Sequence, residues 1–457
     1  MRLLHSRREV AAVFDEPNLV SAAGLVPVLR LARVAGLQEL AGRQLSVPTD
    51  KGANAGAKVA SLVAGMVAGA DSIDDMRLLR HGGMRRLFTG CYAPSTLGSF
   101  LRAFSFGHVR QLDAVAARFL AGLVCRSPLL PGAGTVLVDV DDTIVEVHGY
   151  AKQGAGFGYS KVRGLNALLA TASTTGSAPV VVGQRLRKGA TNSARGAKRL
   201  VSDALRTVSR VAGGRPVLLR ADSAFYGAAT LTTAVKAGAQ VSVTVRQDAR
   251  IKAAIGAIGA DAWTPIAYRE AIFDEATGRW ISRAEVAEVP FVAFASRPAA
   301  QQVAGRLVVR RIPELNPDGQ DGLFDLWRFH AFFTTSSLDT VTADQAHRGH
   351  AIIEQVHADL KNSALAHLPS GQFTANAAWL VLAVIAFNLT RAAATLTGPR
   401  LATATTGTLR RTLINIPARI ATSARRLVLH LPRAWPWQDA WSDLLQRACG
   451  PPAAAAS

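Results

Sequence analysis

The feature that most constrains the fold is a series of short apolar segments over residues 131–246. Three of them, TVLVDV, LNALLATAS and PVVVGQRLR, are rich in β-branched or aliphatic residues and predict consecutive strands. A helical pattern follows over 193–211, then the strand PVLLRAD, a helix over 228–237 and the strand QVSVTVR. Three strands in a meander, followed by helix, strand, helix and strand, predict an α/β fold around a mixed sheet.

This order is that of a ribonuclease-H-like core, and the other segments can be assigned around it. Residues 1–130 carry apolar positions at helical spacing and predict a helical N-terminal region. Residues 247–335 are strand-rich and contain several tryptophans, which predicts a β-rich insertion between core segments 131–246 and 336–395, since a structureless loop of that length is implausible. Residues 396–457 form an arginine-rich C-terminal region.

Three acidic residues are the leading candidates for chemistry. Asp141 and Asp222 each lie at or near the end of a predicted buried strand, and Glu354 lies in the helical stretch HRGHAIIEQVHADLK. Carboxylates from two strand ends and one helix can converge on a pair of hard divalent cations, which drive phosphoryl transfer on nucleic acids. Strand alternation puts Asp139 on the same face as Asp141, so Asp139 is an alternative or supporting ligand.

The Glu354 helix has a polar face of its own. His347, His350, Glu354, His357 and Lys361 recur at steps of three and four residues, so we expect all five to point one way. The histidines do not form the H-E-x-x-H zinc pair. We therefore predict that the histidines and the lysine contact phosphates or bases.

The segment VLVDVDDTI also allows a different chemistry. Its D-x-D-x-T pattern opens haloacid-dehalogenase-like phosphatases, in which Asp139 would be the nucleophile and Asp141 the general acid. Those enzymes need a later strand that ends in paired acids, and RADSAFYG supplies only Asp222. The phosphatase stays as the alternative function.

Composition favours a nucleic-acid partner. The chain has 457 residues, 52 basic against 32 acidic, a formal charge of +20 and a pI of about 10.9. Its three cysteines form no CxxC pair and fit a reducing cytosol, and the charged start MRLLHSRREV is not typical of a secretory signal. We expect the longest apolar run, residues 377–387, to be a core helix.

The sequence resembles that of a known family, the DDE transposases of bacterial insertion sequences. The resemblance is closest to the branch with a β-strand insertion before the last acid, insertion-sequence family thirteen-eighty. It extends over residues 130–437 in matching order, through the stretches VDVDDTIVEVHGYAKQGAGFGYSKVRG, LRKGATNSARG, LLRADSAFYG, RGHAIIEQVHADLKNSAL, LPSGQFTANAAWLVLAVIAFNLTR and RRLVLHLPRAWPW.

The resemblance implies catalytic and metal-ligating roles for Asp141, Asp222 and Glu354, with two Mg²⁺ ions for which Mn²⁺ can substitute. It implies cleavage and strand transfer at the inverted-repeat ends of a mobile element, in a synaptic homodimer in the bacterial cytoplasm. A copy that binds these ends without cutting them is a further alternative. The residues for which we predict DNA contacts are Lys361, His350, His347, Arg348, Tyr226 and Arg187.

In the β-rich insertion, we expect Trp263, Trp280 and Trp327 to pack in a core, with stacking on an unpaired DNA base as the alternative.

Overall fold

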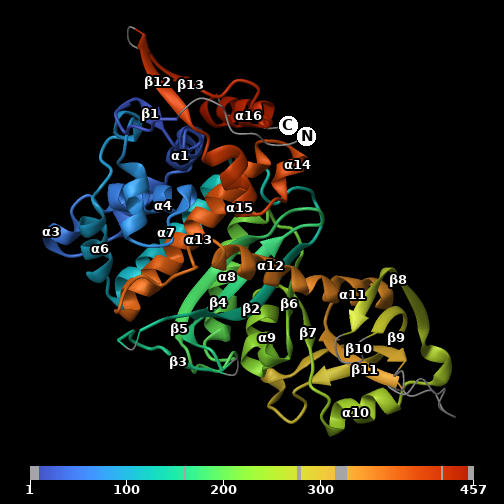
Figure 1. Cartoon of the computed structure of the whole chain (residues 1–457). Helices are drawn as coiled ribbons and strands as arrows, with labels where there is room; N and C mark the ends of the chain where they lie inside the picture. Colours follow the sequence, from blue (N-terminus) through green and yellow to red (C-terminus); the bar gives the residue numbers. More distant parts are fainter. Residues whose placement is uncertain are drawn as a thin grey trace.

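The computed structural model describes residues 10–149, 151–158, 161–274, 279–313, 327–423 and 426–450. Its centre is a mixed sheet, with a helical region on one side and a second group of strands on the other (Figure 1).

The N-terminal region is helical, as its apolar spacing predicts. Ser105 begins the longest of these helices with a capping box, in which its hydroxyl accepts from the backbone N–H of His108. The elements are β1 (Leu19–Val20), α1 (Leu25–Val34), α2 (Leu37–Gln44), α3 (Thr49–Gly52), α4 (Ala55–Ala68), η1 (Asp74–Leu79), α5 (Met84–Leu87), α6 (Pro94–Arg102) and α7 (Phe106–Val124).

The central sheet has the strand and helix order that the sequence predicts. Its elements are β2 (Val136–Glu146), β3 (Gly156–Phe157), β4 (Arg163–Ser173), β5 (Val180–Lys188), α8 (Ala197–Val211), β6 (Val217–Ala221), η2 (Ser223–Phe225), α9 (Ala228–Lys236) and β7 (Gln240–Thr244). The spatial order is β5-β4-β2-β6-β7, with β4 antiparallel to both of its neighbours and β2, β6 and β7 parallel. β6 ends at Ala221, whereas β2 continues along β4 to Glu146, so Asp141 lies within its strand and not at the strand end that the sequence predicts.

Glycine lets α8 lie close against this sheet. Gly183 on β5 faces the helix, and a Cβ at that position would come within 3.2 Å of the Ala204 Cβ and 3.3 Å of the Leu200 Cδ1. Any larger residue would push α8 away from the strand.

The predicted β-rich insertion is present, and it continues the central sheet. It contains α10 (Ala249–Gly256), η3 (Ala260–Ala262), β8 (Thr264–Asp274), β9 (Arg279–Ala293), η4 (Ala299–Gln301), β10 (Val303–Pro313) and β11 (Trp327–Thr334). β11 pairs antiparallel with β7, with Phe332 opposite Thr244, so the strands of the insertion and those of the central sheet form one ten-stranded sheet. This pairing covers the edge of β7, which would otherwise expose unpaired backbone groups.

Two of the insertion's three tryptophans, Trp263 and Trp327, pack against other residues of the insertion, as expected. Trp263 and Trp327 each lie 4.2 Å from the Arg311 guanidinium, measured to the ring centroid, and Arg311 is ion-paired with Glu285. The side chain of Trp280 lies outside the described residues.

The remaining helices close the core and join the two ends of the chain. They are α11 (Thr340–Arg348), η5 (Gly349–Ala351), α12 (Ile352–Lys361), α13 (Phe373–Thr395), α14 (Pro399–Ala402), α15 (Thr406–Leu409), η6 (Arg410–Ile414) and α16 (Gln438–Cys449), with strands β12 (Ala418–Ser423) and β13 (Arg426–His430). β12 pairs with β1, so the arginine-rich tail packs against the N-terminal region; the β12–β13 hairpin projects at the top of Figure 1.

The core helix predicted around residues 377–387 is α13, which is longer than its apolar run. By length and composition it could cross a membrane, but its most apolar stretch is entirely buried between α7, α4 and β5. It is the central helix of the protein interior in this structure.

Candidate active site

The structure brings Asp141 and Asp222 together at the edge of the sheet. β2 and β6 are parallel neighbours, and their register pairs Val140 with Ala221. Asp141 and Asp222 directly follow these two paired residues. β6 ends at Ala221, and the Asp222 Oδ1 accepts a hydrogen bond from the Ala224 N–H at 3.0 Å, which caps the short helix η2. The sequence therefore positions Asp222 by ending the strand directly before it.

The surroundings of both carboxyl groups disfavour their negatively charged form. Burial, followed by the negative charge of Asp222, raises the pKa of Asp141 to about 6. Burial also raises the pKa of Asp222, and the charge of Asp142 adds to this effect. Two adjacent acids with raised pKa values favour a bound cation, because a cation would lower the cost of ionising both.

The raised pKa predicts that Asp141 destabilises the fold at neutral pH. The folded protein binds this proton more tightly than the unfolded chain, so stability falls as the pH rises from about 4 to about 6. We expect Asp141→Asn to raise the free energy of unfolding at pH 7 by about 2 kcal/mol, and this gain to shrink as the pH falls toward 5. Urea unfolding at the two pH values measures it; a variant less stable than the wild type at pH 7 would contradict the prediction.

Asp139 has a different environment from Asp141. It is fully buried, and the Arg220 Nε and Nη2 donate to its two carboxylate oxygens at 2.7 Å each. The His350 Nδ1 lies 3.1 Å from the Asp139 Oδ1. Because both oxygens are engaged, the geometry favours Asp141 as the ligand and gives Asp139 a supporting role. It also argues against Asp139 as the nucleophile of a phosphatase.

The Asp139–Arg220 pair also holds the end of α11, the helix before the one that carries Glu354. The Arg220 Nη1 donates to the backbone carbonyl of Ala346 at 2.5 Å, at the end of α11. Gly349 makes room for this contact, since a Cβ there would lie 2.8 Å from the Arg220 Nη1. A single buried ion pair therefore connects β2, β6 and the α11–η5 junction.

Glu354 lies on the helix that packs across β2. His350, four residues before it, contacts Asp139, and the Nδ1 of His357, three residues after it, lies 3.7 Å from the Asp141 Oδ2. The Glu354 side chain is exposed, and among the described residues no hydrogen bond or ion pair joins it to Asp141 or Asp222, so the structure brings two of the three candidate acids together. Within the described part of the chain, no group of three or more His, Cys, Asp or Glu side chains is arranged to hold a metal ion.

The expectation that five polar residues share one helix face is wrong, because the helix breaks. α11 ends at Arg348, and the 3₁₀ turn η5 separates it from α12. His347 turns instead toward the sheet, where it stacks on Phe332 with ring centroids 4.1 Å apart and bonds to the Ser242 and Thr244 hydroxyls. Burial lowers the pKa of His347 to about 3, so the ring is neutral at physiological pH.

Three other residues for which we predict DNA contacts have partners within the protein. Arg348 is ion-paired with Asp344 at 2.8 Å. Arg187 is buried and donates to Asp142, to Asn166 and to three backbone carbonyls of the loop after β5. Tyr226 packs on Phe294 with ring centroids 4.8 Å apart, and burial raises its pKa to about 12. Gly227, not Tyr226, is the N-cap of α9.

Lys361 lies in a cavity of about 560 Å³ whose acidic residues are Asp142 and Glu146, and Asp141, Asp222 and Glu354 do not line it. Burial lowers the pKa of Lys361, and no hydrogen bond or ion pair joins it to another described residue. The cavity also contains hydroxyls and apolar side chains that the sequence analysis did not single out: Thr143, Thr191, Ser193, Ile144, Val162 and Leu365. Thr191 and Ser193 lie in the stretch LRKGATNSARG, whose small polar residues were the available signal.

The fold and the paired acids at its sheet edge define a candidate nucleic-acid-processing site. A family model described as "Transposase DDE domain group 1" matches residues 3–449, nearly the whole chain. The chain therefore belongs to this family of DDE transposases, enzymes whose partner is DNA. A search of the curated proteins finds no match.

Proposed function

We propose that this protein is the transposase of an insertion sequence, in the branch with a β-strand insertion before the catalytic glutamate. It cuts DNA at the inverted-repeat ends of the element and joins the freed end to a target. The observation that carries the proposal is the adjacent placement of Asp141, within β2, and Asp222, directly after the parallel strand β6, both with raised pKa values. The strand order β5-β4-β2-β6-β7 supports a ribonuclease-H-like core.

The donor set fits hard divalent cations. Asp141, Asp222 and Glu354 would supply carboxylate oxygens, the ligand type that Mg²⁺ and Mn²⁺ prefer. When bound, two such ions neutralise charge on the attacking and leaving oxygens of a phosphodiester. Glu354 completes the set by turning from solvent toward β2, which its position between His350 and His357 allows.

The surrounding residues align the DNA strand. Lys361 in the 560 Å³ cavity binds a phosphate beside the scissile bond, and the apolar wall formed by Ile144, Val162 and Leu365 contacts the sugar or base. His357 at Asp141 is neutral at pH 7, because burial lowers its pKa to about 4, so it can accept a hydrogen bond without repelling a cation.

The other regions have supporting roles. We assign end recognition to residues 1–130 and dimerisation or DNA contact to residues 396–457, around a catalytic core of 131–246 and 336–395 with the insertion at 247–335. Two subunits would pair the element's two ends in a synaptic homodimer.

Cation binding is expected to stabilise the protein. Mg²⁺ at millimolar concentration should raise the melting temperature at pH 8 and have less effect at pH 5, because protons then compete for Asp141 and Asp222. Thermal unfolding with Mg²⁺, Mn²⁺ and no divalent ion measures the shift. Asp222→Asn should abolish it, and an equal shift in that variant would contradict the proposed ligands.

The function itself is tested by incubating the purified chain with Mg²⁺ and labelled duplexes that carry the inverted repeats flanking its gene. We expect nicks that leave 3′-hydroxyls, followed by joined products. Hydrolysis of a small phosphate ester with no action on DNA would support the phosphatase, and binding without cutting would indicate an impaired copy.

A further inference from the structure

A groove between α7 and α8 carries more positive charge than its acids can neutralise. It has a volume of about 240 Å³, and residues 181–184 of β5 form its floor. Two acids, Asp113 and Asp203, face it. The arginines that line it or bind those acids are Arg110, Arg118, Arg185, Arg199, Arg206 and Arg210.

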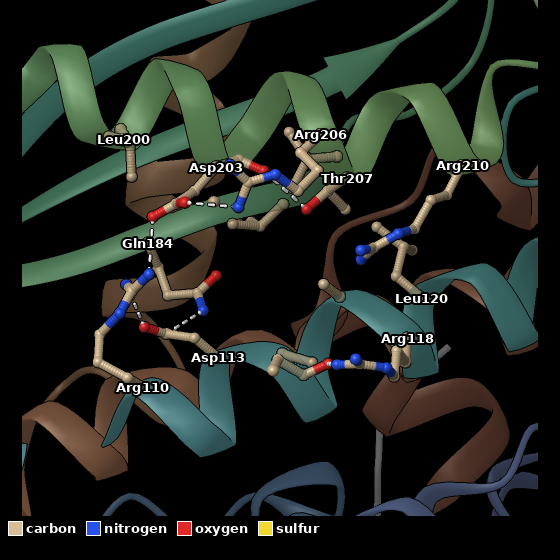
Figure 2. Close-up of a pocket in the computed structure, with 16 residues that line it drawn as sticks. Arg110, Asp113, Arg118, Leu120, Gln184, Leu200, Asp203, Arg206, Thr207 and Arg210 are labelled. Carbon is tan, nitrogen blue, oxygen red and sulfur yellow. Dashed lines mark hydrogen bonds and ion pairs between the residues drawn. The ribbon is translucent and has the colours of Figure 1, made fainter. Parts of the chain in front are cut away.

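The carboxylates lie at one end of this groove. The Arg110 guanidinium donates to Asp113 and to Asp203, at 2.8 Å each, and the Gln184 amide donates to Asp113 at 2.7 Å. Arg206 reaches Asp203 from the other side at 3.4 Å. Figure 2 shows this cluster around Arg110, Gln184 and the two aspartates.

The opposite end has cations and no carboxylate among its described residues. Arg118 bonds only neutral acceptors, the Gln44 side chain at 3.1 Å and the Ala114 carbonyl at 3.2 Å. No hydrogen bond or ion pair joins Arg210 to another described residue, and Figure 2 shows its guanidinium directed into the groove. Two exposed guanidiniums on facing helices can donate from both sides to one tetrahedral anion.

We propose that this groove binds a phosphate group of the DNA backbone through Arg118 and Arg210. The site is built from α7, α8 and β5, whereas the candidate catalytic acids come from β2, the end of β6 and α12. It therefore holds a stretch of DNA other than the phosphodiester being cut. The proposal requires only the family's DNA partner and does not depend on the roles of Asp141, Asp222 and Glu354.

DNA is the occupant that the charges favour. The chain as a whole has a formal charge of +20, so a second copy offers little acidic surface to this groove. A phosphate bound by two arginines releases counterions from the DNA, and the observed affinity then falls steeply with salt.

The test measures the affinity of the full chain for a labelled duplex of arbitrary sequence between 50 and 200 mM KCl. Each phosphate contact adds about 0.9 to the slope of log affinity against log salt. We expect Arg118→Gln/Arg210→Gln to lower the slope by about 0.9, so that the affinity falls roughly three- to fourfold less over this range of salt. Lys198→Gln is the matched control: it removes one exposed charge from α8 outside the groove.

If the double variant folds poorly, the single variant Arg210→Gln is measured instead, because no hydrogen bond or ion pair joins Arg210 to another described residue. The site is overturned if the slope is unchanged in a folded variant, or if Lys198→Gln lowers it as much as Arg210→Gln does. Inorganic phosphate at matched ionic strength distinguishes the source of the anion. Phosphate that weakens DNA binding by the wild type more than by the variant competes for this groove and supports DNA as its occupant. A variant that loses affinity for inorganic phosphate while its DNA affinity and salt slope are unchanged would replace DNA with a free-phosphate site.

Discussion

Replacing Asp222 by asparagine is expected to abolish Mg²⁺-dependent nicking of the element's ends. The rate should fall on the order of 10³-fold or more, because the change removes one of two adjacent carboxylates while leaving the strand end intact. Asparagine is also a good N-cap, so the bond from the Ala224 N–H to this side chain can persist. DNA binding should therefore stay close to that of the wild type. Cleavage of end-labelled duplex, read as single turnovers, measures the rate.

Asp248→Asn is the matched control for this experiment. Asp248 is also an aspartate N-cap in the loop after a parallel strand, and it accepts from the N–H groups of Arg250 and Ile251. The same chemical change at that position should leave nicking unchanged. If Asp222→Asn cuts as fast as Asp248→Asn, Asp222 is not part of the reaction. If the wild type itself binds the ends and never cuts, the copy is impaired.

Replacing Asp139 by asparagine should instead unfold much of the protein. Arg220 is only 2% exposed, and without the Asp139 carboxylate its charge would be buried without a counterion. Removing one partner of a buried pair costs about 3–5 kcal/mol. We expect a loss of this size in the free energy of unfolding, measured in urea. The pair Asp359–Arg391 is buried to a similar degree at 2.7 Å, so Asp359→Asn should lose a comparable amount.

The double variant Asp139→Leu/Arg220→Met separates stability from chemistry. Because a buried ion pair can often be replaced by apolar residues at little cost, this variant should recover much of the stability. Its nicking should stay low, since the contact from Arg220 to the Ala346 carbonyl, which holds the end of α11 before the Glu354 helix, is lost. A phosphatase with Asp139 as nucleophile predicts the opposite pattern for Asp139→Asn: a normally stable fold that no longer hydrolyses a small phosphate ester.

The sequence predicts the core strands and the strand end before Asp222 because these depend on local patterns, but it places the end of β2 too early, since that strand continues past Asp141 to Glu146. The alternation of apolar residues in β2 and the short apolar run before Asp222 each have one reasonable interpretation. Their pairing follows from the parallel order of the strands, so the proximity of Asp141 and Asp222 was also predictable.

The remaining features depend on partners far away in the chain. Nothing near Asp139 indicates that Arg220 lies opposite it, although this ion pair engages both carboxylate oxygens of Asp139. The helix breaks at Gly349, where a Cβ would lie 2.8 Å from the Arg220 Nη1, a contact with a residue far away in the chain. Likewise, the continuous sheet formed by β7 and β11 requires a pairing between residues about 90 positions apart, which periodicity does not predict.

The central claim is that Asp141, Asp222 and Glu354 hold the same cations. The most direct measurement replaces Mg²⁺ with Fe²⁺ in the DNA-bound protein, adds ascorbate and peroxide, and maps where locally formed hydroxyl radicals cut the polypeptide. We predict cuts close to residues 141, 222 and 354, all suppressed by excess Mg²⁺. Cuts near 141 and 222 with none near 354, while Glu354→Gln still nicks DNA, would contradict the account.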